Sequence, residues 1–173
     1  LALALPPARV AIIDSGIDPD HPFFSPAGYT MPAGFPKGQQ RFTTAKVIVA
    51  RAFAPAGTTY ARARRPFDAG SSMHGTQVAG IAAGNAGTNA GGARISGIAP
   101  RAWIGNYKAL SIPTDAGVGL DGNAPELVAA IEAAGLRVKQ VKENPQYRFI
   151  SANAQGATRK YGVKSASLVA IKG

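Results

Sequence analysis

The sequence predicts an α/β domain with a mostly parallel sheet. Short runs of consecutive apolar residues are typical of strands buried on both faces, and they alternate with segments of helical periodicity. The composition supports a folded globular chain, because 46% of the 173 residues are hydrophobic and only 16% are charged. A chain of this length fits one domain with a sizeable core.

The first predicted strand covers residues 9–13, where four apolar residues follow Arg9. It ends at Asp14-Ser15-Gly16, so the sequence places a carboxylate directly after a buried strand. In open α/β sheets ligands bind at the carboxyl ends of the strands. Asp14 is therefore a candidate functional residue.

Two further strands are predicted at residues 46–50 and 101–110, which are again rich in apolar residues. The segments at 25–41 and 55–72 are irregular or polar and contain many turn-forming residues. Long surface loops of this kind cost little stability, so they are compatible with a compact sheet.

A helix is predicted from about His74 to Gly84, because Val78, Ile81 and Ala82 lie at helical spacing. Its many small residues would let it pack closely against its neighbours. The Gly- and Asn-rich segment 85–92 is predicted to be a loop that ends this helix.

A second helix is predicted to begin at Asn123, with Pro125 in its first turn and Glu126 positioned to close a capping box. Gly135 is the expected stop. The buried face is predicted to comprise four apolar residues: Leu127, Val128, Ile131 and Ala134.

Charge is unevenly distributed along the chain, whose net charge is +10. Residues 1–136 hold 11 basic and 8 acidic residues, whereas residues 137–173 hold 8 basic residues and one acidic residue. We therefore predict a main domain at 1–136 and a basic extension of unrecognised origin at 137–173. No RNA-recognition signature supports nucleic acid as a partner, so the extension is interpreted as a solvated basic surface.

Several functional classes are excluded or not expected. The chain has no Cys, which rules out disulfides, thiol catalysis and Cys-ligated zinc. The sequence contains no run of about 18 apolar residues, so no membrane span is expected. The apolar run at residues 1–5 is too short for the core of a signal peptide. The sequence does not indicate an oligomeric state.

Two segments together resemble the catalytic Asp and His motifs of the subtilisin-like serine proteases, peptidase family S8. They are Val-Ala-Ile-Ile-Asp-Ser-Gly-Ile-Asp at 10–18 and His-Gly-Thr-Gln-Val-Ala-Gly-Ile at 74–81. Each motif alone is weak, but both occur in the family's order, and residues 95–102 resemble the segment that follows the His helix. The resemblance covers roughly residues 9–134. It implies the N-terminal part of a three-layer subtilisin-like fold, which is incomplete here.

The resemblance implies that Asp14 and His74 are catalytic. A neutral imidazole takes a proton from a serine hydroxyl and later returns it to the leaving amine. A carboxylate on the other ring nitrogen fixes the tautomer and stabilises the imidazolium. A carboxylate at a rigid strand end suits this orienting role.

The chain departs from the family pattern at the nucleophile. It contains no Gly-Thr-Ser, and the segment Ser165–Ala170 is only faintly similar to the family's nucleophile helix. Asn153 is the only loose candidate for the oxyanion-hole Asn, and an ordinary loop Asn is the simpler interpretation. Gln77 stands where the family often has His, a position that is not the catalytic base.

The resemblance implies a secreted or extracellular serine endopeptidase that acts on polypeptides, although we expect this chain to be inactive alone. The alternative is a non-catalytic protease remnant or a peptide-binding module. Subtilisin-like enzymes often bind structural calcium, so the resemblance allows a calcium ion. Asp18, Asp20 and His21 do not form a convincing ligand set, because calcium prefers several oxygen ligands. We predict no metal ligand and no certain cofactor.

Overall fold

The computed structural model describes residues 8–114, 120–147, 155 and 165–172. The chain divides into two compact units, Leu1–Ala130 and Ile131–Gly173. This division shows where contacts are dense and does not show where a family domain ends. The predicted boundary between residues 136 and 137 therefore stays a prediction.

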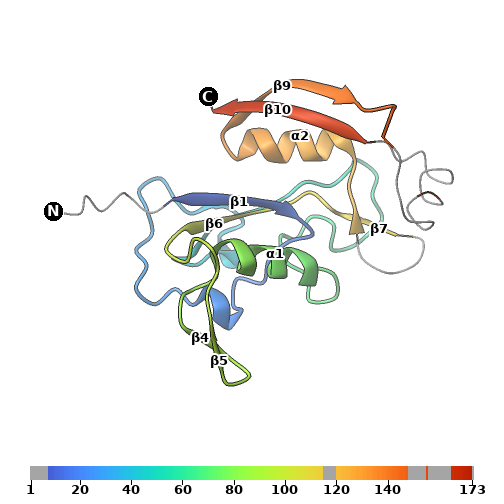
Figure 1. The fold of residues 1–173 in the computed structure, drawn as a ribbon. Helices are drawn as coiled ribbons and strands as arrows, with labels where there is room; N and C mark the ends of the chain where they lie inside the picture. Colours follow the sequence, from blue (N-terminus) through green and yellow to red (C-terminus); the bar gives the residue numbers. More distant parts are fainter. Residues whose placement is uncertain (1–7, 115–119, 148–154, 156–164, 173) are drawn as a thin grey trace. The chain divides into compact units, whose positions relative to one another are not determined.

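The first unit is built on a four-stranded parallel sheet with the strand order β1-β6-β3-β2 (Figure 1). The three strands predicted from apolar runs are all present, and together with the parallel pairing they confirm the incomplete subtilisin-like α/β fold. The strands are β1 (Arg9–Asp14), β2 (Lys37–Gly38), β3 (Val47–Ala52) and β6 (Trp103–Lys108).

The strand register brings Asp14 to the same sheet edge as the ends of its neighbours. Asp14 pairs with Lys108 of β6, and Lys108 pairs with Ala52 of β3. All three residues are the last of their strands, so the carboxyl ends are level. This is the edge at which parallel α/β sheets bind their ligands.

The predicted helix is α1 (Met73–Ala83), which connects β3 to β6 and packs on the sheet. Its buried residues are small, namely Gly75, Ala79, Gly80 and Ala83. Ile12, Val47 and Ile104 of the sheet share one apolar core with α1. Ile81, which the helical spacing grouped with Val78 and Ala82, is instead 69% exposed. The helix approaches its neighbours through small residues because large ones would hold it away.

Phe23 lies on the short 3-10 helix η1 (Pro22–Phe24), and its ring packs against α1. A Cβ added at Gly80 or Gly84 would collide with its ring, so both glycines are needed for this contact. A second 3-10 helix, η2 (Gln40–Phe42), precedes β3.

The segment predicted as a loop at 85–92 is partly a β-hairpin, which corrects that prediction. Strands β4 (Thr88–Ala90) and β5 (Ala93–Ile95) pair in antiparallel fashion around Gly91 and Gly92. Both glycines have positive φ angles, as two-residue hairpin turns require. The Gly pair is thus a hairpin turn rather than a sign of irregular chain. Two short strands, β7 (Ile112–Pro113) and β8 (Leu120–Asp121), also pair in antiparallel fashion.

The second helix, α2 (Ala124–Ala133), begins directly after Asn123 as predicted. Its fully buried residue is Ala130, whereas the four apolar residues predicted for the buried face are only partly buried. Gly135 adopts a φ of 93° just beyond the helix, as expected for a residue that ends one.

In the second unit, β9 (Leu136–Glu143) pairs with β10 (Ala166–Lys172) in antiparallel fashion. The segment with a faint similarity to the nucleophile helix is therefore mostly strand, which argues against that role for Ser165 and Ser167. Within the described ranges of the chain, no helix has the length and apolarity that crossing a bilayer requires.

Candidate active site

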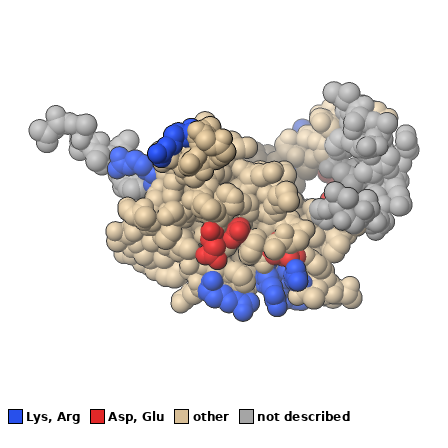
Figure 2. Space-filling model, turned by 90° about the horizontal axis from the view of Figure 1, so that it is seen from below, with Lys and Arg blue, Asp and Glu red and all other residues tan. Residues whose placement is uncertain are grey.

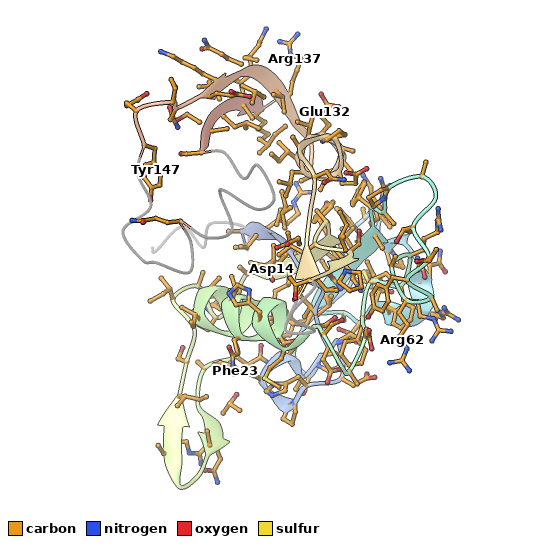
Figure 3. The ribbon with its side chains drawn as sticks, turned by 90° about the vertical axis from the view of Figure 1, so that its right-hand side faces the viewer. Asp14, Phe23, Arg62, Glu132, Arg137 and Tyr147 are labelled. Atoms are coloured by element: carbon orange, nitrogen blue, oxygen red, sulfur yellow. The ribbon has the colours of Figure 1, made fainter. Side chains whose placement is uncertain are left out.

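Asp14 is held at the end of β1 with its carboxylate mostly shielded from solvent. The residue is 8% exposed, and the Ser15 backbone N–H donates to Oδ1 at 2.6 Å. Figure 3 shows Asp14 between the end of the sheet and α1. An acceptor fixed at this place can orient one partner from the helix.

That partner is His74, the second residue of α1. Its Nδ1 lies 2.8 Å from Oδ1 and 3.0 Å from Oδ2 of Asp14. Because an ionised carboxylate only accepts hydrogen bonds, Nδ1 carries a proton, and in the neutral imidazole Nε2 then has a lone pair. The imidazole side chain is 71% exposed, so Nε2 is available to a group outside the pair.

Two glycines allow α1 to reach the turn after β1. A Cβ at Gly75 would overlap the backbone of Gly16, including its carbonyl oxygen. Gly16 has a φ of 104°, which L side chains rarely adopt, and its own Cβ would overlap the carbonyl of Pro66. The Gly75 N–H also donates to Ser15 Oγ at 3.2 Å. Residues that follow Asp14 and His74 directly in the sequence thus fix the distance between them.

Two hydroxyl groups complete this attachment. Ser72 Oγ donates to the carbonyl of Ser15 at 2.9 Å, and Thr76 Oγ1 donates to the carbonyl of Ser72 at 2.7 Å. Thr76 Oγ1 in turn accepts the N–H of Asp18 at 3.0 Å. The turn after β1 is therefore hydrogen-bonded to Ser72 and Thr76, which lie two residues before and two residues after His74 in the sequence.

Asp68 organises the loop that leads into α1. Its carboxylate accepts hydrogen bonds from Tyr60, Arg62, Ser71 and the Gly70 N–H, the Arg62 distance being 2.6 Å. Burial alone would raise the pKa of this carboxyl, but the bonds from Tyr60 and Arg62, with smaller help from Gly70 and Ser71, hold it well below its usual range.

Asp68 is also connected to the pair through the backbone. Its N–H donates to Ser72 Oγ at 3.0 Å, and its carbonyl accepts the N–H of Ser72 at 2.8 Å. Sequence reasoning described residues 55–72 only as a polar loop and missed Asp68. The one available signal was an Asp followed by Ser71 and Ser72 just before the helix.

Comparisons with known proteins show the family of the chain. The Subtilase family model matches residues 8–167. The chain belongs to the subtilase family. The match also continues past residue 136 into the basic extension.

Curated subtilases from Arabidopsis thaliana are similar over most of the chain. Subtilisin-like protease SBT2.3 is 37% identical over 150 residues, and SBT2.2 is 37% identical over 154 residues. Each alignment covers 72% of this chain but only 16% of the plant protein. The chain thus spans about one sixth of the length of these relatives.

A serine-protease site also needs a nucleophile within reach of the His74 ring. In residues 8–114, 120–147 and 165–172 no serine hydroxyl is hydrogen-bonded to His74. Ser111 is fully buried and donates to the carbonyl of Phe53. Asn153, the loose candidate for the oxyanion hole, lies outside the described residues.

The described residues do not fit a carboxylate-rich calcium site. No group of three or more His, Asp or Glu side chains gathers in the part of the chain that the structure describes. Asp18 Oδ1 instead accepts the N–H of Asp20, and His21 Nδ1 accepts the N–H of Phe23. Both hydrogen bonds are those of a turn that covers residues 18–23.

Proposed function

We propose that this chain supplies the Asp and His of a serine-endopeptidase active site, with Asp14 as the orienting carboxylate and His74 as the general base. The contact between His74 Nδ1 and the Asp14 carboxylate supports this most directly. Subtilase membership supports polypeptides as the substrate class and a secreted or extracellular location.

The proposed chemistry follows from the tautomer of His74. With its proton on Nδ1, the ring accepts the proton of a serine hydroxyl at Nε2 as that oxygen attacks the scissile carbonyl. The same proton then passes to the leaving amine, and a second cycle with water releases the acyl group. Asp14 orients the ring and stabilises the imidazolium that forms.

We further propose that the 173-residue chain alone hydrolyses peptide bonds very slowly or not at all. Its sequence contains no Gly-Thr-Ser motif. Removing the nucleophile from a catalytic triad lowers kcat by about a million-fold. The Asp–His pair would then require a serine from sequence beyond these residues.

Two assays test the proposal. For the purified chain, casein hydrolysis should not exceed that of its His74→Ala variant, and robust hydrolysis that a serine-directed phosphonate abolishes would contradict the inactivity. For the full product of the gene, we expect a Gly-Thr-Ser type motif after Gly173, with hydrolysis lost in His74→Ala. A full product without such a motif would contradict the endopeptidase role.

The missing nucleophile also favours a second candidate, a subtilase remnant that binds peptides without cleaving them. In that case the exposed His74 would not act as a general base, and His74→Ala would hardly alter peptide binding. Turnover by the full gene product that disappears in His74→Ala would eliminate this candidate.

A further inference from the structure

A concave site lies beyond the C-terminal end of α1, away from His74 at the start of the helix. It has a volume of about 370 Å³ and is lined by the segments around Pro22, Tyr29, Asn85 and Arg101. Asn85 is eleven residues after His74 in the sequence, which corresponds to about 16 Å along a helix axis. Neither Asp14 nor His74 lines the pocket, so it is independent of the proposed function.

The pocket carries positive charge without acidic neighbours. Arg101 is the charged residue of its lining, which contains no Asp or Glu. Arg101 belongs to neither of the ion pairs Arg62–Asp68 and His74–Asp14. Among the described residues it therefore has no carboxylate partner.

A second cation lies directly behind the wall. Lys46 is fully buried, and its Nζ donates to Tyr29 Oη at 2.8 Å and to the carbonyls of Pro100 and Ala102 at 2.8 and 2.7 Å. All three acceptors are uncharged. Burial lowers the pKa of Lys46 to about 8, as expected for a cation whose charge no carboxylate offsets.

Hydrogen bonds hold the wall in place. Tyr29 Oη donates to Asn85 Oδ1 at 3.0 Å, and Asn85 Nδ2 donates to the carbonyl of Ser25 at 2.7 Å. Thr88 Oγ1 donates to the carbonyl of Asn85 at 3.0 Å. The cavity is thus formed before any ligand enters, which reduces the entropy cost of binding.

We propose that this pocket binds an organic carboxylate, either a free small carboxylate or the C-terminal carboxylate of a peptide. The planar guanidinium of Arg101 matches a carboxylate with two parallel hydrogen bonds. The apolar side chains of Pro22, Ala27 and Ala86 contribute to the lining and can contact the carbon skeleton of such a ligand. Inorganic phosphate can pair with the same guanidinium but has no carbon skeleton that would contact these apolar side chains.

The test is a binding titration of the full 173-residue chain at constant ionic strength, in which NMR monitors binding. The probes are succinate, inorganic phosphate, and a short peptide with either a free or an amidated C-terminus. We expect saturable shifts of the amide resonances of residues 85–88. A free small carboxylate as the ligand would give them with succinate, whereas a peptide C-terminus as the ligand would give them with the free-acid peptide and not with the amidated peptide. Arg101→Gln should weaken binding at least tenfold, whereas Arg65→Gln, which removes an exposed cation outside the pocket, should not change it.

Three results would overturn the proposal. One is the absence of saturable binding by either carboxylate probe. Another is an equal loss of affinity in Arg101→Gln and Arg65→Gln, which would indicate nonspecific attraction to a basic protein. The third is phosphate binding as tight as succinate binding, which would show that the site responds to charge alone.

Discussion

At the scale of single residues, Asp68 and Lys46 hold buried charge in opposite ways. Asp68 gathers four hydrogen-bond donors, which favour its ionised form. Lys46 makes three hydrogen bonds, all to uncharged oxygens, and burial disfavours its ionised form. Both folded pKa values lie below the unfolded ones, so each residue makes the protein more stable as the pH rises, Asp68 in the acidic range and Lys46 in the alkaline range.

Asp68→Asn should lower the free energy of unfolding by about 1–3 kcal/mol at pH 7, because buried donors lose a charged acceptor. The folded pKa of Asp68 lies below its unfolded value, so this stabilisation is complete above about pH 4 and is lost as the pH falls further. Urea unfolding at several pH values checks both expectations. The exposed Asp20→Asn should change little, and a pH-independent difference between Asp68→Asn and the unmodified chain would contradict the account.

Lys46 should make the protein more stable as the pH rises. Its folded pKa of about 8 lies below the value in an unfolded chain, so between about pH 8 and 10 the unfolded state binds more protons. The free energy of unfolding should increase over this window by about 1–3 kcal/mol. In Lys46→Met the increase should shrink, whereas the exposed Lys37→Met should keep it. Equal pH slopes for both variants would show that Lys46 is not the titrating group.

Asp14 and His74 could be predicted from the sequence because each lies within a short local motif. Asp68 could not, because its partners Tyr60, Arg62 and Ser71 are spread over a loop whose path the sequence does not indicate. Lys46 was assigned to a strand from its neighbours, and nothing in the local pattern shows that its amine is buried.

At the scale of elements, the close approach of α1 to the turn after β1 holds the site together. The approach depends on Gly75, which faces the backbone of Gly16. The sequence indicated a helix rich in small residues, and the structure shows which of them face the sheet. Apolar spacing alone included Ile81 in the helical face, because periodicity does not distinguish a face packed by glycine and alanine from one packed by larger residues.

Gly75→Ala tests this close approach, because two effects predict opposite changes in the free energy of unfolding. Helix propensity alone predicts that alanine stabilises α1 by up to about 1 kcal/mol. The overlap with Gly16 should instead destabilise the protein by about 1–3 kcal/mol. Gly70→Ala, where the nearest atom to the added Cβ is 3.7 Å away, is the matched control and should be nearly neutral. Thermal or urea unfolding measures both variants, and a stabilised Gly75→Ala would rule out the close approach.

At the scale of the whole molecule, several apolar side chains of the first unit are exposed, on α1 and on the segment between β5 and β6. Met73, Ile81 and Ile98 are 70%, 69% and 86% exposed. The Ile98 N–H donates to the carbonyl of Ile81, so these two residues are neighbours. Figure 2 shows that much of the face seen from below carries no charged side chain. Exposed apolar side chains that lie next to one another promote association.

We therefore expect the purified chain to self-associate. Ile81→Lys should raise the monomer fraction in sedimentation velocity and should change the free energy of unfolding by no more than about 0.5 kcal/mol, because the residue is exposed. Ala61→Lys adds the same charge elsewhere on the first unit and should have a smaller effect. A chain that is already fully monomeric at high concentration would contradict the expectation.

The sequence predicted the sheet and the basic character of residues 137–173, but it did not predict the antiparallel pairing of β9 with β10. Alternating apolar and basic residues in β9 are a weak strand signal, and the partner strand lies more than twenty residues away. Pairing across such a separation depends on tertiary contacts that a local pattern does not contain.

The most direct test of the Asp14–His74 contact is the tautomer of the two histidines, measured by long-range ¹H–¹⁵N NMR above their pKa values. His74 should carry its proton on Nδ1 because it donates to Asp14, and His21 should carry it on Nε2 because its Nδ1 accepts the Phe23 N–H. Asp14→Ala should remove the preference of His74 and leave His21 unchanged. A neutral His74 protonated on Nε2, or one unaffected by Asp14→Ala, would contradict the proposed active site.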